Sequence, residues 1–228
     1  MKVTGILAAA GIGKRLGASK PKQFIEIAGR PILEWSIRAL TSCPTINAIV
    51  VAAPPDNISH AEEIISSCNP TIPIKVIAGG PTRQESVRLA LEATDNNVEW
   101  VAIHDAARPM VQANDIEAVC LMAMEIGAAI LAIPIHDTVK EVDEDTPLIV
   151  RTLNRDQLFR AQTPQVCRKQ DLITAMINAK ESGMESTDEA GMLEAIGISV
   201  GIVNGSRLNF KITTEEDLLL AKAILETY

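Results

Sequence analysis

The chain has 228 residues, of which 47% are apolar and only 3% aromatic, and its formal net charge is −8 at pH 7. This composition is typical of a globular protein with an aliphatic core. The acidic balance excludes a broad basic face for DNA or RNA, and no apolar stretch reaches the roughly 18 residues of a membrane span. We therefore expect no nucleic-acid or membrane partner, and any anionic ligand should be small and locally held.

The cysteines favour a cytoplasmic protein with no structural zinc. Cys43, Cys68, Cys120 and Cys167 are widely spaced, and the sequence has neither a C-x-x-C pair nor a neighbouring histidine cluster. Disulfide frameworks and zinc sites both need closer, patterned spacing. The four residues are therefore interpreted as reduced packing residues.

The first predicted element is a strand over 3–10 that leads into a basic, glycine-rich loop. The stretch I-L-A-A-A-G-I-G-K-R-L-G-A-S-K-P-K-Q covers residues 6–23 and contains Lys14, Arg15, Lys20 and Lys22. Glycines let backbone N–H groups approach a phosphate closely, and basic side chains can meet its remaining oxygens. The loop therefore predicts a triphosphate cradle, with an ordinary turn carrying solvated cations as the alternative.

Two better-known phosphate loops fit this stretch poorly. A P-loop, G-x-x-x-x-G-K-[ST], requires a glycine-lysine pair that does not follow Gly11 or Gly13 at the required offset. A dinucleotide loop, G-x-G-x-x-G, requires glycine at the position of Leu16. Glu34 could still accept a ribose hydroxyl, so a dinucleotide-dependent oxidoreductase stays a weaker alternative.

Strand and helix patterns alternate over the next hundred residues. Nearly continuous apolar runs, which are typical of parallel strands buried on both faces, occur at 3–10, 46–53, 74–78, 98–104 and 128–134. Helical patterns lie between them at 31–42, 57–67, 82–94 and 114–127. Asp56, Thr82 and Asn114 are the predicted N-caps. This order predicts a Rossmann-like α/β fold, with a mostly parallel twisted sheet and helices on both faces.

After 134 the pattern changes to that of a β-hairpin. Residues 137–143 alternate with period two, 144–147 favour a turn, and 148–153 can return as a second strand. An isolated hairpin is marginal in water, so this projecting arm, at about 137–155, is expected to pack on a second copy of the chain. We expect one domain over 1–228 and a homodimer formed through the arm.

The C-terminal third predicts three further helices, at 169–182, from Ser186, and at 215–226. Ser186 with Glu189, and Thr213 with Glu216, match the capping-box spacing.

Motifs along the whole chain resemble one family of nucleotidyltransferases. The loop L-A-A-A-G-I-G-K-R-L-G with P-K-Q is similar to the signature of sugar-phosphate nucleotidyltransferases. The runs that narrow the resemblance are H-D-A-A-R-P at 104–109, D-T-V-K at 137–140, N-R-D-Q-L at 154–158, A-Q-T-P-Q at 161–165, T-D-E-A at 187–190 and N-F-K-I-T at 209–213. Together they resemble the 2-C-methyl-D-erythritol 4-phosphate cytidylyltransferases of non-mevalonate isoprenoid synthesis.

This resemblance implies attack by a sugar-alcohol phosphate on the α-phosphorus of CTP, with release of pyrophosphate. Two anions must meet, so the site has to neutralise charge and align the reacting groups. The family's catalytic cations match Arg15, Lys22, Arg155 and Lys211. Mg²⁺, or another divalent cation, is the implied cofactor; it is held by the CTP phosphates, and Asp105 is a possible ligand.

The resemblance also assigns the binding residues. Nucleotide contacts match Ala9, Ala10, Gly11, Gly13, Gly80 and Ser86. Pro81 departs from family members that have Asp there, which removes one side-chain acceptor near the base. For Ser86 a simple role at a helix start is the alternative.

Acceptor contacts match Asp105, Arg108, Thr138, Thr163 and Thr187. Asp105 with Arg108 could instead form a plain salt bridge, and Thr187 could serve only near a helix cap. Thr138 and Arg155 lie in the arm, so the resemblance implies that a partner subunit completes each pocket.

Other functions remain open at this stage. A ribitol 5-phosphate cytidylyltransferase would share the fold and the nucleotide loop. From other classes, an oxidoreductase is disfavoured by Leu16, and a non-catalytic nucleotide-binding module by the presence of both Arg15 and Lys22.

Overall fold

The computed structural model describes residues 2–11 and 21–227, and its centre is a seven-stranded sheet. The strand order is β11-β7-β10-β6-β1-β4-β5. These strands are β1 (Val3–Ala8), β4 (Ile46–Ala53), β5 (Ile74–Ala78), β6 (Trp100–Asp105), β7 (Ala128–Pro134), β10 (Phe159–Arg168) and β11 (Val200–Asn204). All pairings are parallel except those of β10, which runs antiparallel to both neighbours. The mostly parallel α/β sheet is therefore confirmed.

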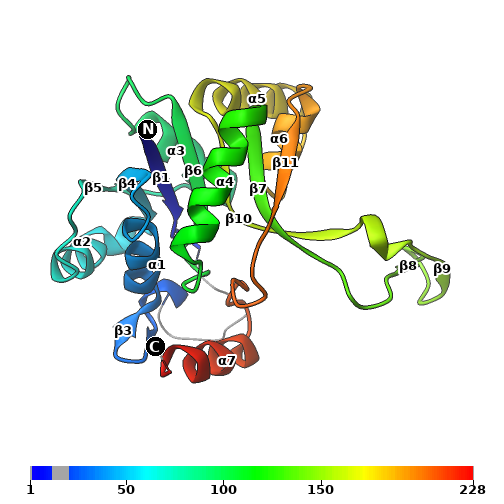
Figure 1. Cartoon of the computed structure of the whole chain (residues 1–228), viewed down its shortest axis with the longest axis horizontal. Helices are drawn as coiled ribbons and strands as arrows, with labels where there is room; N and C mark the ends of the chain where they lie inside the picture. The colour runs from blue at the N-terminus through cyan, green and yellow to red at the C-terminus, as the bar shows by residue number, and fades with distance from the viewer. Residues whose placement is uncertain (1, 12–20, 228) are drawn as a thin grey trace.

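Seven α-helices are present among the described residues, and the first six of them cover both faces of the sheet (Figure 1). They are α1 (Ile32–Thr41), α2 (Ile58–Ser67), α3 (Arg83–Glu92), α4 (Ala113–Ile126), α5 (Lys169–Ser182), α6 (Glu189–Ala195) and α7 (Glu215–Leu225). One apolar cluster joins α1, α2 and α4 to the sheet, and a second joins α3, α5 and α6 to the opposite face. None of the described helices is long and apolar enough to cross a membrane.

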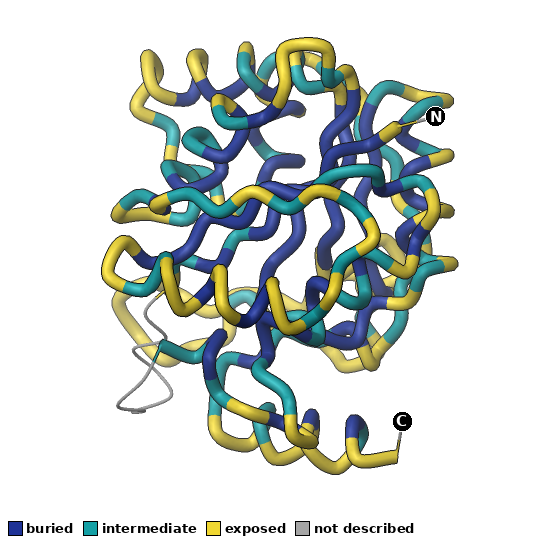
Figure 2. Tube along the Cα trace, turned by 90° about the vertical axis from the view of Figure 1, so that its left-hand side faces the viewer, coloured by how far each residue is buried: buried dark blue, intermediate teal, exposed yellow. Residues whose placement is uncertain are grey.

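The side-chain spacing in α1 explains why this segment forms a helix on the sheet. Leu33, Ile37 and Leu40 are fully buried and recur at intervals of four and three residues, which places them on one helical stripe. The strands beneath are buried on both faces, as the continuous apolar runs predicted. Figure 2 shows these buried strands at the centre, with exposed residues on the outer turns.

Short elements complete the chain. A two-stranded ribbon is made of β2 (Glu26–Ile27) and β3 (Arg30–Pro31), and single 3₁₀ turns are η2 (Lys22–Phe24), η3 (Pro55–Asn57) and η4 (Arg155–Gln157). Helix α7 packs over Ile27 and Ile32 through a small separate cluster that includes Ala221 and Leu225. The N-terminal ribbon and the C-terminal helix therefore close the same end of the molecule (Figure 1).

The predicted hairpin is present as β8 (Lys140–Val142) and β9 (Ile149–Thr152), and it projects from the body (Figure 1). Its stem continues the β7–β10 pair, since Phe159 pairs with Pro134 and the amide of Ile135 bonds to the carbonyl of Leu158 at 3.1 Å. The arm is thus an outgrowth of the central sheet.

Several helix starts differ from the predicted caps by one to two residues. Thr82 is the N-cap of α3 as predicted, and its side chain accepts from the amide of Glu85. The side chains of Asp56 and Asn114 cap nothing, because α2 begins after Asn57 and α4 after Gln112. The last two helices also begin one or two residues after the predicted caps, where another carboxylate or hydroxyl side chain is available. Asp188 caps α6, and Thr214 with Asp217 forms the capping box of α7.

Candidate active site

The ends of three neighbouring strands bring distant motifs together at one edge of the sheet. In the parallel register, Ala8 at the end of β1 pairs with Ala52 of β4 and Asp105 of β6. Backbone bonds continue past the strand ends, from the amide of Ala9 to Ala52 at 2.9 Å and from the amide of Ala106 to Ala8 at 3.1 Å. This carboxyl edge is where open α/β sheets bind ligands.

A close backbone approach joins the β1 loop to the turn after β5. A Cβ at Gly79 would lie 2.3 Å from Cβ of Ala10, and a Cβ at Gly80 would lie 2.3 Å from Cγ of Glu85. Only glycine permits these contacts. The hydroxyl of Ser86 lies within hydrogen-bonding distance of the Thr82 carbonyl, 2.8 Å, and accepts from the amide of Gly80 at 3.1 Å. Both glycines and Ser86 thereby set the shape of this turn.

Together these segments surround a hollow. Its lining comes from the β1 loop, η2, the start of α3, the end of β6 and the segment before α7: Ala8, Ala9, Ala10, Gly11, Lys22, Gln23, Pro81, Arg83, Ser86, Asp105, Ala106, Ala107 and Lys211. Gly80 shapes the adjoining turn without lining the hollow.

Lys22 and Gln23 place polar groups of η2 at this hollow. The ammonium of Lys22 donates to the carbonyl of Ile212 at 3.2 Å, which ties η2 to the segment that carries Lys211. Gln23 is 2% exposed, and its Nε2 has no hydrogen-bond partner among the described residues. A buried donor without a partner is costly, so this amide is suited to a bound ligand.

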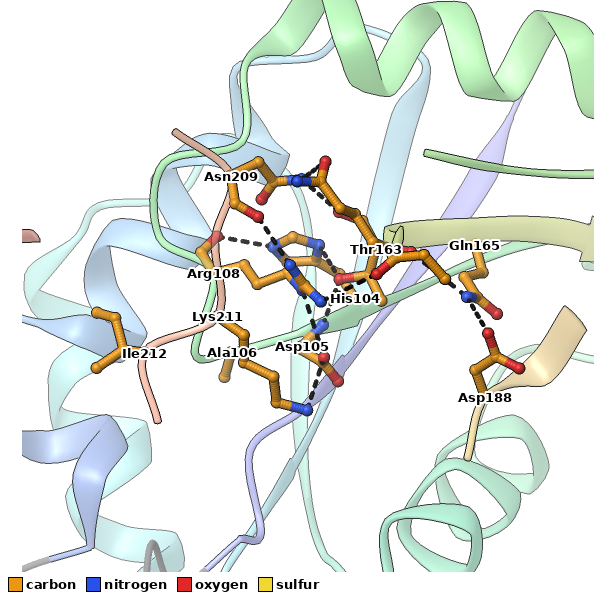
Figure 3. A network of polar contacts seen from close by, with 12 residues as sticks. His104, Asp105, Ala106, Arg108, Thr163, Gln165, Asp188, Asn209, Lys211 and Ile212 are labelled. Atoms are coloured by element: carbon orange, nitrogen blue, oxygen red, sulfur yellow. Dashed lines mark hydrogen bonds and ion pairs between the residues drawn. The ribbon is translucent and has the colours of Figure 1, made fainter. Parts of the chain in front are cut away.

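Asp105 is the centre of a buried charge network (Figure 3). Arg83 donates through Nε to Oδ1 of Asp105 at 2.8 Å, and Lys211 lies 2.9 Å from Oδ2. Arg83 also forms two bonds to Glu189, at 2.6 and 3.0 Å. Arg108 Nε lies 3.5 Å from Oδ2 of Asp105. Three cations thus converge on one carboxylate, and a second carboxylate holds one of them in place.

The network determines which groups are charged. Burial alone would raise the pKa of Asp105, but the charges of Arg83 and Lys211 outweigh it and hold that pKa well below its usual range. Burial would lower the pKa of Arg83, and Glu189 and Asp105 raise it above its usual value. For Arg108, burial prevails and lowers the pKa. Asp105, Arg83 and Arg108 therefore keep their charges at neutral pH, so the site is electrostatically preorganised.

Comparisons with known proteins match nearly the whole chain. The family profile for 2-C-methyl-D-erythritol 4-phosphate cytidylyltransferase matches residues 3–227. The chain belongs to this family. The enzymes of that name from Desulforamulus reducens and Bacillus cereus are 39% and 40% identical to it, over 98% and 97% of this chain and 96% and 97% of theirs.

Solved structures of the family agree with the fold. The Thermus thermophilus enzyme of the same name superposes with a TM-score of 0.80 at 32% identity, covering 98% of each chain. The 4-diphosphocytidyl-2C-methyl-D-erythritol synthase from Anaerococcus prevotii reaches 0.87 at 28% identity, over 99% of this chain and 96% of that one. The resemblance predicted from the motifs is therefore confirmed.

The described residues bring most of the family's motif residues to the hollow. Seven of the predicted residues line it directly: Ala9, Ala10, Gly11, Lys22, Ser86, Asp105 and Lys211. Arg108 and Thr163 lie behind Asp105, where the amide of Asp105 donates to Oγ1 of Thr163 at 3.0 Å. Gly13 and Arg15, both predicted contacts, lie outside the described residues.

Three predicted contacts lie elsewhere in this chain. Thr138 and Arg155 are exposed residues of the arm, and Arg155 donates to the carbonyl of His136. Thr187 is exposed and precedes Asp188, the N-cap of α6. None of the three is among the described residues that line the hollow.

Two residues at the site were missed in the sequence. Arg83 stands in the first turn of α3, where a cation opposes the helix dipole, and that conflict signals an acidic partner. Glu189 follows the cap of α6 and is fully buried, although charged side chains are seldom buried without a partner. Each residue needs an opposite charge, and only the structure shows that the two supply it to each other.

Proposed function

We propose that the chain transfers CMP from CTP to 2-C-methyl-D-erythritol 4-phosphate and releases pyrophosphate. The observation that carries this proposal is the convergence of family motifs from separate parts of the chain on one hollow at the carboxyl edge of the sheet. The family match and the names of the relatives support it. The product is 4-diphosphocytidyl-2-C-methyl-D-erythritol, a precursor in non-mevalonate isoprenoid synthesis.

The proposed reaction needs positioning and charge neutralisation, and no covalent intermediate. An oxygen of the acceptor phosphate bonds to the α-phosphorus of CTP as the bond to the α–β bridging oxygen breaks, and pyrophosphate leaves with the electron pair. Lys22 and Lys211 face this space from η2 and from the segment before α7. We assign them, with Arg15, to the negative charge of the reacting phosphates.

The nucleotide is proposed to lie along backbone groups. Ala9, Ala10 and Gly11 follow β1 with few side-chain atoms, and Gly80 with Ser86 fixes the neighbouring turn. Cytosine presents an N4 donor and an O2 acceptor, which backbone groups can satisfy. Pro81 lines the hollow and supplies no N–H, so base recognition is assigned to its neighbours.

The acceptor is proposed to lie on the Asp105 side. The carboxylate of Asp105 and the guanidinium of Arg108 would bind its hydroxyl groups, with Thr163 and Thr187 at the edge of this region. Arg155 and Thr138 would then come from the arm of a second subunit.

Mg²⁺ is proposed to arrive with CTP, held by its phosphates. The described residues contain no group of three or more His, Cys, Asp or Glu side chains suited to a metal ion. Both oxygens of Asp105 already face cations, so this carboxylate does not fit a metal-ligand role as it stands. Mg²⁺ commonly binds through substrate phosphates.

A homodimer through the arm is proposed because the arm exposes apolar surface. Leu148, Ile149 and Val150 are 67%, 61% and 58% exposed, beside Val142 at 50%. An apolar patch of this kind marks a contact surface. Sedimentation of the intact chain against one lacking 139–152 tests this. Loss of the dimer is expected, and a shortened chain that still sediments as a dimer would contradict the arm's role.

The free cysteines fit a cytoplasmic location.

The activity is tested by pyrophosphate release from CTP and Mg²⁺ with either methylerythritol phosphate or ribitol 5-phosphate as acceptor. Release with the first acceptor at a much higher kcat/KM is expected. A preference for ribitol phosphate would reassign the substrate, and no release with either would refute the proposed activity.

A further inference from the structure

His104 is a fully buried side chain that has no part in the proposed chemistry. It precedes Asp105 at the end of β6 and is 0% exposed. Its Nδ1 lies 2.9 Å from Oγ1 of Thr163, and its Nε2 lies 3.0 Å from the carbonyl oxygen of Arg108. Both ring nitrogens therefore contact residues that also bond to Asp105 or lie beside it (Figure 3).

For a neutral imidazole, the donors and acceptors around His104 allow one arrangement of protons. The Arg108 carbonyl can only accept, so Nε2 must carry a hydrogen. A neutral imidazole carries only that one ring hydrogen, so its Nδ1 is unprotonated and accepts from the hydroxyl of Thr163, whose oxygen accepts from the amide of Asp105. A neutral imidazole with its hydrogen on Nε2 satisfies both of its own nitrogens, the Arg108 carbonyl and the Thr163 hydroxyl.

Asn209 completes a closed ring of hydrogen bonds around His104. Its side-chain Nδ2 donates to the main-chain carbonyl of Thr163 at 2.9 Å, and its main-chain carbonyl accepts from Nη1 of Arg108 at 2.8 Å. Hydrogen bonds therefore run from His104 to Thr163, to Asn209, to Arg108 and back to His104. The ring joins β6, β10 and the segment before α7, three parts of the chain that are far apart in sequence.

We propose that His104 is a positioning residue, which fixes the main chain at Asp105 and the turn that carries Arg108 through this ring of hydrogen bonds. The inference rests on the proposed function, since it gives Asp105 and Arg108 their purpose. Burial keeps the imidazole neutral, because it lowers the pKa of His104 to about 4. The charge of Asp105 raises this pKa and the charge of Arg108 lowers it, but burial is the largest cause. The imidazole thus holds its neighbours without taking up a proton at neutral pH.

The first test is independent of any activity. Nitrogen-15 NMR of the imidazole in the intact protein at pH 7 is expected to show hydrogen on Nε2 and a bare Nδ1. Thr163→Ser, which keeps the hydroxyl, should retain this signature, whereas Thr163→Val should shift the Nδ1 resonance because it removes the donor. A wild-type ring protonated on Nδ1, or equal spectra for the two variants, would overturn the proposal.

The second test separates positioning from general stability. His104→Phe keeps a ring but removes both nitrogens, and it should raise the KM for methylerythritol phosphate about tenfold, as expected for losing buried hydrogen bonds. The KM for CTP should change by less than about twofold. His104→Gln retains a donor and an acceptor and should recover part of the loss.

The outcomes distinguish the two proposals. An equal loss for both substrates, or no recovery in His104→Gln, would overturn the role of His104. Should His104→Phe fail to fold, the NMR comparison of the Thr163 variants still decides the matter. Absence of turnover in the wild type, with the expected NMR signature present, would refute only the proposed activity.

Discussion

The Asp105 network and the β8–β9 arm are both rich in charged groups, yet they obtain their partners differently. Asp105, Arg83 and Glu189 are joined by buried bonds that come from β6, α3 and α6 of one chain. The arm has its own ion pair, Arg151 with Glu141 at 2.6 Å, but both side chains are solvent-exposed. The first region is therefore complete within a single chain, while the arm exposes apolar residues that find no cover in it. The charges of the Asp105 network are thus preorganised within one chain, whereas the proposed role of the arm depends on a second subunit.

The largest effects should come from the cations of each region. Lys22→Ala in the hollow and Arg155→Ala in the arm should each lower kcat by on the order of 10²–10³, as does removal of one transition-state donor elsewhere. Steady-state pyrophosphate release measures this. Lys222→Ala, on the exposed face of α7, is the matched control and should retain wild-type rates. Near-full activity in Lys22→Ala would contradict its role.

Mixing the two inactive variants tests whether the arm acts between subunits. Co-expressed in equal amounts, Lys22→Ala and Arg155→Ala should form heterodimers in which one pocket has both cations intact. Random pairing makes about half of the dimers mixed, so about one quarter of wild-type activity should return. Recovery near zero, with both single variants inactive, would show that Arg155 serves the pocket of its own chain.

A matched pair of charge removals compares buried and exposed ion pairs. Asp105→Asn removes the buried carboxylate that faces Arg83, Arg108 and Lys211, and leaves Glu189 as the remaining partner of Arg83. It should lower the free energy of unfolding by about 3 kcal/mol. Glu141→Gln in the arm should cause no measurable change, because exposed pairs contribute little. Urea unfolding of both variants gives the comparison. Equal losses would contradict the contrast between the two regions.

The buried site should also show a pH signature that the arm lacks. The folded protein holds the pKa of His104 at about 4, below the value of about 6.5 in an unfolded chain. The unfolded state then binds a proton that the folded state excludes, so stability is complete above about pH 6.5 and is lost as the pH falls toward 4. His104→Gln should flatten the urea-unfolding profile over this window. The same dependence of unfolding free energy on pH in the wild type and in His104→Gln would contradict this contribution of His104.

The smallest predicted effect concerns Gln23, whose buried Nε2 lacks a partner among the described residues. Gln23→Met keeps the length of the side chain and removes the amide, so it should raise the free energy of unfolding by about 1 kcal/mol. It should also raise the KM for CTP a few-fold. Calorimetry and steady-state kinetics measure the two changes. A lower melting temperature would show that the amide already has a stabilising contact.

The sequence was most informative where burial follows a simple pattern. Strands β1, β4, β5, β6 and β7 were predicted because each is a nearly continuous apolar run. Strand β10 was missed because its buried residues include Gln162, Thr163 and Gln165, which read as loop residues. The Gln162 amide bonds to Ser206 and that of Gln165 to Asp188, so long-range hydrogen bonds replace the apolar contacts that a pattern can detect.

The site residues also differ in how far the sequence could place them. Residues next to a strand end, such as Gly11 and Asp105, could be placed at the carboxyl edge from topology alone. The bridge from Arg83 to Glu189 could not, since it spans 106 positions and depends on how α3 and α6 pack against the sheet. Nor could the burial of His104 be distinguished from ordinary packing until its two hydrogen-bond partners were located.

Strand β10 leaves the arm, pairs with β7 at Phe159 and passes between β7 and β6. It therefore carries Thr163 on the same continuous backbone as the stem of the arm. In the proposed dimer, a shift of one subunit's arm as it meets the neighbouring pocket would pull directly on the strand beside its own Asp105. Substrate binding in one pocket would then be linked to the other pocket through the continuous backbone of the arm and β10.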